Sequence, residues 1–240
     1  MSKVGAVYLL GSPGDVSEAK KSGVQFRTKL FVTKTGQIKD NQPLYGVKYD
    51  LNNMVRFWKQ KSMAVAGGLC LPQFSKRDAL QSIRQYFNEN WASELYVLYY
   101  SGHGEEETGN WVFTDGTVSY YDVYELWYQS GKSEAKELWI ISDSCFAGNW
   151  ITAAMRSQRY NCRRILLICS STSNNISYDI ENEGGDFTNK FIRHSGDILK
   201  TSAMIGCVSY HNSVRESWTQ DNITSTEYIE LSLLSKKRIY

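Results

Sequence analysis

One cysteine and one histidine in this chain lie in turns whose residue types suit nucleophilic chemistry. Cys145 follows a polar Ser-Asp-Ser triplet and precedes Gly148, and His103 lies between Gly102 and Gly104. A thiol with its ordinary pKa of about 8.5 is mostly protonated at neutral pH, so a nearby imidazole must accept its proton before it can attack. Taken singly, such residues are more often structural. As a pair in similar turns, they indicate a cysteine nucleophile with a histidine base.

Two short apolar runs precede these turns and would position them. Residues 95–100 (LYVLYY) and 138–141 (LWII) are rich in aliphatic and aromatic side chains and are too short for helices, which predicts buried parallel strands. The carboxyl ends of parallel strands form the edge at which open α/β sheets bind ligands. We therefore expect His103 and Cys145 to meet at this edge.

Strand and helix patterns alternate along most of the chain. This alternation favours an α/β fold with a mostly parallel central sheet and helices on both faces. A length of 240 residues suits a single domain over residues 1–240, and Asp115-Gly116 predicts a hairpin. Further strands are expected at 4–11, 69–71, 164–169 and 228–234, and helices are expected from Asp50 onward and at 76–88, 121–128 and 150–159.

Composition and charge reduce the number of functional classes to which this chain could belong. The formal net charge is +2 and the basic runs are short, so a nucleic-acid partner is not expected. Every apolar run is shorter than the roughly 18 residues of a membrane-spanning helix, and the amino terminus does not resemble a signal peptide. Five cysteines without CxxC spacing argue against a disulfide framework and a four-cysteine zinc site. The expected location is the cytoplasm, with no membrane partner.

Four short motifs carry a family resemblance. YYSGHG, which ends at Gly104, and DSCFAG, which starts at Asp143, resemble the catalytic pair of the caspase and metacaspase superfamily of cysteine peptidases. An L-x-G-x-x-x-D pattern at 44–50 and a G-x-F-T pattern at 185–188 resemble two further segments of that superfamily. The resemblance covers residues 4–198 and is closest to metacaspases and prokaryotic caspase-like proteases. It implies a caspase-like sandwich fold.

The resemblance also implies peptide-bond hydrolysis and assigns roles in it. Cys145 would be the nucleophile that forms an acyl-enzyme, and His103 would accept its proton and later supply the leaving amine. The backbone amides of Gly104 and Cys145 would form the oxyanion hole. Protein or peptide substrates are implied, together with an activating protease or a regulatory partner, in cell death, stress or defence signalling.

The charge of the implied substrate pocket indicates its specificity. Caspases that cut after aspartate have an arginine before the first helix and a glutamine two residues before the nucleophile, whereas this chain has Leu44 and Asp143 there. Asp143, Asp50 and Ser101 could together bind a guanidinium group, and Ser170 follows another strand at the same rim. Arginine or lysine is therefore expected before the scissile bond. Asp50 has a second interpretation, as the N-cap of the helix that follows it.

No cofactor is expected. Many metacaspases hold calcium with an acidic cluster that includes a residue on the helix after the nucleophile, but residues 146–159 contain no carboxylate. Asp115 and Asp122 are the residues that could form a displaced calcium site. The predicted site therefore contains no metal ligands.

Residues 17–43 are interpreted as an insertion, because they form a longer connection than a minimal caspase-like core needs. Such a polar, lysine-rich segment is either an inert surface loop or a regulatory or substrate-contacting element. Residues 199–240 give no clear pattern apart from the strand expected near the carboxyl terminus.

Two other functional classes compete with a peptidase. A caspase-like scaffold could bind a partner protein without cutting it, but it would have no need to keep Cys145, His103 and both glycines beside the histidine. A flavodoxin-like nucleotide binder would share the fold class, but the chain has no glycine-rich phosphate loop. The sequence therefore favours the peptidase.

Overall fold

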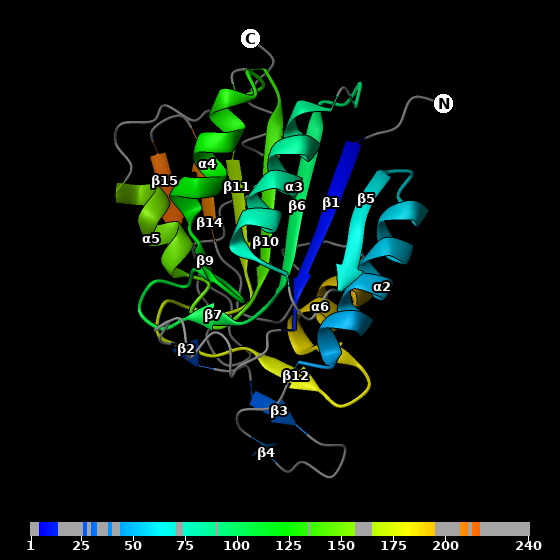
Figure 1. The fold of residues 1–240 in the computed structure, drawn as a ribbon, viewed down its shortest axis with the longest axis vertical. Helices are drawn as coiled ribbons and strands as arrows, with labels where there is room; N and C mark the ends of the chain where they lie inside the picture. The colour runs from blue at the N-terminus through cyan, green and yellow to red at the C-terminus, as the bar shows by residue number, and fades with distance from the viewer. Residues whose placement is uncertain are drawn as a thin grey trace.

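A seven-stranded sheet forms the centre of the computed structural model (Figure 1). In sheet order, its strands are β15 (Ser213–Glu216), β14 (Cys207–Tyr210), β11 (Ile165–Cys169), β10 (Glu137–Asp143), β6 (Leu95–Gly102), β1 (Gly5–Ser12) and β5 (Ala64–Cys70). The five strands from β11 to β5 are parallel, and the pairs β11–β14 and β14–β15 are antiparallel. The structure describes residues 5–13, 26–27, 30–32, 38–39, 44–70, 74–89, 91–133, 135–156, 165–194, 207–210 and 213–216.

Helices cover both faces of this sheet. The described helices are α2 (Gly46–Gln60), α3 (Lys76–Asn88), α4 (Tyr120–Gln129), α5 (Asn149–Arg156) and α6 (Asp186–Arg193). Side chains of α3, α4 and α5 share one apolar core, and those of α2 and α6 share another. Alternate residues of β6 divide between the two cores, with Leu98 in the first and Tyr99 in the second, as the pleat of a strand requires. The expected α/β fold with a mostly parallel sheet is therefore confirmed.

Two small four-stranded sheets lie beyond the carboxyl ends of the parallel strands (Figure 1). One has the order β13 (Gly184–Gly185), β12 (Tyr178–Ile180), β3 (Leu30–Val32) and β4 (Ile38–Lys39). The other has the order β2 (Phe26–Arg27), β7 (Gly104–Glu105), β8 (Trp111–Phe113) and β9 (Gly116–Val118). Strands β8 and β9 are the hairpin predicted around Asp115-Gly116. Both small sheets include strands from the insertion at 17–43.

Local capping explains where two helices begin. The backbone amide of Asp78 donates to Ser75 Oγ at 3.0 Å, so Ser75 caps α3 at the expected residue. Ser119 and Asp122 form a reciprocal capping box at the start of α4. No described helix is long and apolar enough to cross a membrane.

One strand boundary was placed wrongly. Strand β5 begins at Ala64 rather than at residue 69. Gly67 and Gly68, with φ of +72° and +87°, interrupt its apolar pattern, and the register with β1 shifts opposite them. The predicted helix at 150–159 is described as far as Arg156. The strand predicted at 228–234 lies outside the described residues.

Candidate active site

Cys145 lies in the turn between β10 and α5, and its side chain is fully buried. The next residue, Phe146, has a φ of +55°, a left-handed conformation that costs a non-glycine residue of order 1 kcal/mol. Its amide donates to the carbonyl of Asn175 at 2.8 Å. The amide of Ser177 donates to Cys145 Sγ at 3.3 Å. The segment that follows β11 therefore lies directly on the thiol.

Serine hydroxyls hold the backbone of this turn. The amide of Ser144 donates to Ser170 Oγ at 3.0 Å, and the amide of Ala147 donates to Ser171 Oγ at 3.0 Å. Ser171 Oγ in turn donates to the carbonyl of Ser144 at 2.9 Å. Ser170 therefore contacts the cysteine turn in this structure, and the substrate-binding role predicted for it stays a prediction.

The turn that carries His103 packs against the cysteine turn. A β-carbon added to Gly104 would lie 1.9 Å from the carbonyl oxygen of Cys145, and one added to Gly102 would lie 2.2 Å from the Tyr100 hydroxyl. That hydroxyl donates to the carbonyl of His103 at 2.9 Å. A side chain at either position would therefore clash with its neighbours, which only glycine avoids. The structure brings the two predicted turns together, as the parallel strand order leads one to expect.

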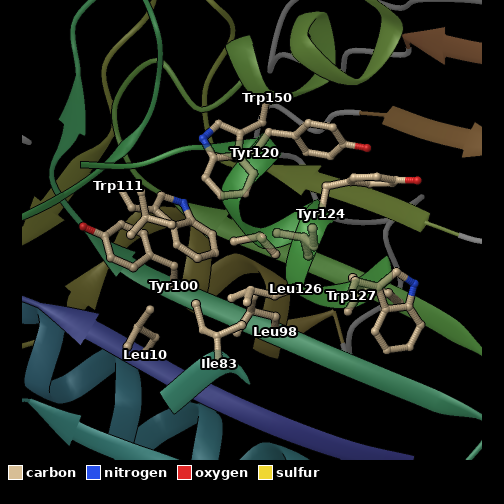
Figure 2. Packing of buried hydrophobic residues seen from close by; sticks show 14 of the residues in the cluster. Leu10, Ile83, Leu98, Tyr100, Trp111, Tyr120, Tyr124, Leu126, Trp127 and Trp150 are labelled. Atoms are coloured by element: carbon tan, nitrogen blue, oxygen red, sulfur yellow. The ribbon is translucent and has the colours of Figure 1, made fainter. Parts of the chain in front are cut away.

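Tyr100, Trp111 and Trp150 form an aromatic stack in the core beside these turns (Figure 2). The ring of Trp111 stacks on Tyr100, with centroids 4.6 Å apart, and on Trp150, with centroids 4.3 Å apart. Trp111 Nε1 donates to Ser142 Oγ at 2.9 Å, and Trp150 Nε1 donates to the carbonyl of Gly109 at 2.8 Å. The stack links the strand before the histidine to the strand before the cysteine, so it fixes their relative position.

The pKa of Tyr100 is raised far above its ordinary value. Burial is the main cause, and negative charge on Cys145 adds to it. The phenol therefore stays protonated and keeps its hydrogen bond to the carbonyl of His103.

Two buried aspartates, Asp50 and Asp143, lie beside the turns of Cys145 and His103, and we call them the acidic pair. Asp50 Oδ2 accepts from Ser101 Oγ at 2.6 Å, and its Oδ1 accepts from the amide of Gly185 at 2.7 Å. Asp143 Oδ1 accepts from Ser177 Oγ at 3.1 Å. A β-carbon added to Gly185 would lie 2.0 Å from Asp143 Oδ2 and 3.2 Å from Asp50 Oδ2. The two carboxylates, predicted from the sequence to share a pocket, are close neighbours.

The interpretation of Asp50 as an N-cap is wrong. Helix α2 begins at Gly46, so Asp50 lies inside it, and its carboxylate accepts from Ser101 and Gly185. The amide of Gly46 instead donates to Asp179 Oδ2 at 3.0 Å. Asp179 is buried on β12, and it supplies from a distant part of the chain the acceptor that a local N-cap would provide. Leu44, at the position of the caspase arginine, belongs to the apolar core.

Several residues around the site were missed by the sequence reasoning. Ser177 and Asp179 gave no signal of their own, because their partners lie more than 30 residues away in the chain. Gly185 opens the recognised G-x-F-T motif, but the motif did not indicate its bond to Asp50. Thr188 belongs to the recognised G-x-F-T motif, but the motif gave it no role. Its Oγ1 donates to Asp143 Oδ2 at 2.7 Å.

The two possible calcium ligands each have a partner in the protein. Asp115 Oδ1 accepts from the amide of Lys76, and Asp122 Oδ2 lies 3.7 Å from Lys76 Nζ while it also caps α4. Calcium needs six to eight oxygen ligands, and a site at these two residues stays a prediction. Within the described residues, no group of three or more His, Cys, Asp or Glu side chains could hold a metal ion.

Strands of the insertion pair with both sides of the site. In the β2–β7 pair, Arg27 is opposite Gly104, and in the β3–β12 pair, Leu30 is opposite Tyr178, which follows the residue bound to the thiol. Three Cα–Cα steps, from Arg27 to Leu30, span at most about 11 Å. The pairing favours a contact with the active site over an inert surface loop.

The site is covered in this conformation. The side chains of Cys145, His103, Asp50, Asp143 and Ser101 are all 0% exposed. A substrate would reach these groups only if a covering segment moved. The segment around Ser177 contacts the thiol, and strands β2 and β3 pair with β7 and β12 beside the two turns.

Comparisons with known proteins agree with this fold. A family model described as caspase domain matches residues 32–225. A solved structure of caspase-1 from Spodoptera frugiperda is similar in fold, with a TM-score of 0.57, 13% sequence identity, and coverage of 80% of this chain and 68% of the other. No curated protein matches the sequence.

Proposed function

The chain belongs to the caspase domain family of cysteine peptidases, and on that premise we propose that it is an endopeptidase that cleaves after arginine or lysine. The observation that carries this proposal is the acidic pair beside the cysteine and histidine turns. Asp50 and Asp143 are both fully buried and each accepts hydrogen bonds, but two close carboxylates in a buried site still repel each other. A basic substrate side chain would offset this repulsion.

Catalysis would follow from the two turns. Cys145 transfers its thiol proton to His103, and its sulfur attacks the carbonyl carbon of the scissile bond. The amides of Gly104 and Cys145 donate to the oxyanion, and His103 then protonates the leaving amine as the C–N bond breaks. Water, deprotonated by the imidazole, hydrolyses the acyl-enzyme and restores the thiol. The contact between Gly104 and the Cys145 carbonyl supports this assignment.

Specificity would follow from charge. Each charge-assisted hydrogen bond from a guanidinium or ammonium group to the acidic pair is worth about 1.5–3 kcal/mol. An aspartate side chain in the same pocket would meet two like charges in a buried site, which strongly disfavours it.

Reduced thiols and protein substrates fit a cytoplasmic location.

Fluorogenic peptides that end in arginine, lysine, glutamine or aspartate test the proposal. We expect cleavage after the two basic residues and no measurable cleavage after aspartate, with and without added calcium. The measurement is kcat/KM for each peptide, with a thiol-reactive peptide probe to count competent Cys145. Faster cleavage after aspartate, or a probe that never labels Cys145, would argue against the proposed function.

We further propose that the insertion restrains the enzyme by occupying the edges on which an extended substrate would lie. Its strands pair with β7 beside His103 and with β12 beside the thiol contact. A peptide that binds by strand addition needs such edges free. Removal of the strands, by an activating protease or a regulatory partner, would then open the site.

Replacement of Phe31 by proline tests this restraint. Proline removes a backbone N–H from β3, which lies between β12 and β4. Proline should therefore weaken the pairing of β3 by the worth of one hydrogen bond, about 0.5–1.5 kcal/mol, and raise the labelling rate of Cys145 by the peptide probe about two- to tenfold. Phe31→Ala keeps the N–H and serves as the matched control. A folded Phe31→Pro protein labelled no faster than the control would argue against the restraint.

A further inference from the structure

The first turn of helix α6 contacts both members of the acidic pair. The amide of Gly185, its N-cap, donates to Asp50, and the hydroxyl of Thr188, in its first turn, donates to Asp143. The positive end of the helix dipole also favours negative charge at this terminus. Strand β10 and helix α2 supply the two carboxylates, but α6 holds them in position.

A second hydroxyl supports Thr188. Tyr99 OH, on β6, lies 2.6 Å from Thr188 Oγ1, and both side chains are fully buried. A hydroxyl donates one proton, and an ionised carboxylate can only accept. The proton of Thr188 is therefore directed at Asp143, and the phenol donates to Thr188. The bonds run in one direction, from Tyr99 through Thr188 to Asp143.

The phenol is well suited to this donor role. Burial, and then the negative charges of Asp50 and Asp143, raise the pKa of Tyr99 well above its ordinary value. The hydroxyl therefore stays protonated throughout the range of pH in which a peptidase of this kind would work. Tyr99 also lies two residues before Ser101 on the same strand face, and Ser101 donates to Asp50.

We propose that Thr188 is a positioning residue that sets the specificity of the acidic pair, with Tyr99 as its support. This inference rests on the proposed function, in which the pair binds a basic substrate side chain. Thr188 fixes Oδ2 of Asp143 while Ser177 fixes Oδ1, so the plane of the carboxylate is set from both oxygens.

The orientation of the Asp143 carboxylate should affect the binding of arginine more than the binding of lysine. Guanidinium binds carboxylates through two parallel N–H bonds and needs a matching plane, whereas ammonium acts as a compact point charge. A carboxylate released by loss of Thr188 can still attract lysine, but it no longer presents a fixed plane to arginine. The preference for arginine over lysine is therefore the property that depends on Thr188.

The test compares Thr188→Val, Thr188→Ser and Tyr99→Phe with the wild type, on peptides ending in arginine, lysine and glutamine. Valine has the shape of threonine without the hydroxyl, so we expect KM for the arginine peptide to rise about tenfold while kcat changes less. The arginine-to-lysine ratio of kcat/KM should fall, and serine should restore it. Tyr99→Phe should lower the same ratio to a smaller extent.

A purely structural role predicts a different result. It lowers the melting temperature and reduces activity on all three peptides by the same factor, and that outcome would overturn the inference. An unchanged arginine-to-lysine ratio in folded Thr188→Val would also overturn it. If that variant does not fold, an unchanged ratio in Tyr99→Phe decides against the inference in the same way. Failure of the proposed function is seen separately, in a wild-type protein that does not prefer basic peptides.

Discussion

Replacement of Cys145 by alanine is expected to reduce peptide hydrolysis by at least about a thousandfold, because the reaction loses its nucleophile and no acyl-enzyme can form. Fold should be preserved, since the side chain is small and the turn is held by backbone bonds from its serines. Residual turnover and covalent labelling by a thiol-reactive peptide are the measurements. Both should disappear together.

Cys169 provides the matched control. It is a second buried cysteine, it ends the neighbouring strand β11, and it belongs to the apolar core. Cys169→Ala should cost about 1 kcal/mol of stability, from the lost packing of one small side chain, and should retain hydrolysis and labelling. Full activity in Cys145→Ala, or loss of activity only in Cys169→Ala, would contradict the assignment of the nucleophile.

Replacement of Asp143 by asparagine is expected to remove the preference for basic substrates. The substitution keeps the volume of the side chain but removes a buried charge, so the pocket loses one charge-assisted bond to the guanidinium group. A bond worth about 1.5–3 kcal/mol corresponds to a loss of about 10- to 150-fold in kcat/KM on the arginine peptide. Hydrolysis of the glutamine peptide should change much less, because it never depended on that charge.

Asp186 is the control for this prediction. It lies at the start of α6, partly exposed, and forms an ion pair with Lys190 at 3.1 Å. Asp186→Asn removes the same charge near the site but outside the acidic pair, so the arginine preference should persist. The measurement is the ratio of kcat/KM between the arginine and glutamine peptides in the two variants. An unchanged ratio in Asp143→Asn would contradict the pocket assignment.

The fold was largely predictable because its signals are local. The apolar runs before His103 and Cys145 needed only their own residues to be recognised as buried strands, and parallel order then placed both turns at one edge. The start of α3 is also determined locally, because the N-cap Ser75 and its partner Asp78 lie three residues apart. Strand β5 was mistaken where glycines removed the local signal.

The sequence alone determined the class of fold and the candidates for nucleophile, base and acidic substrate contacts, because these depend on residue types at short spacing. Only the tertiary structure decided how the acidic pair is built and held. The placement of Asp50 inside α2, the cap from Asp179, and the contacts of Thr188 and Ser177 with Asp143 all join residues far apart in the chain. Hydroxyl and carboxylate groups can form hydrogen bonds with many kinds of partner, so their positions in the sequence do not indicate which partner each one binds. The packing of the helices and strands determines which of these groups come within hydrogen-bonding distance.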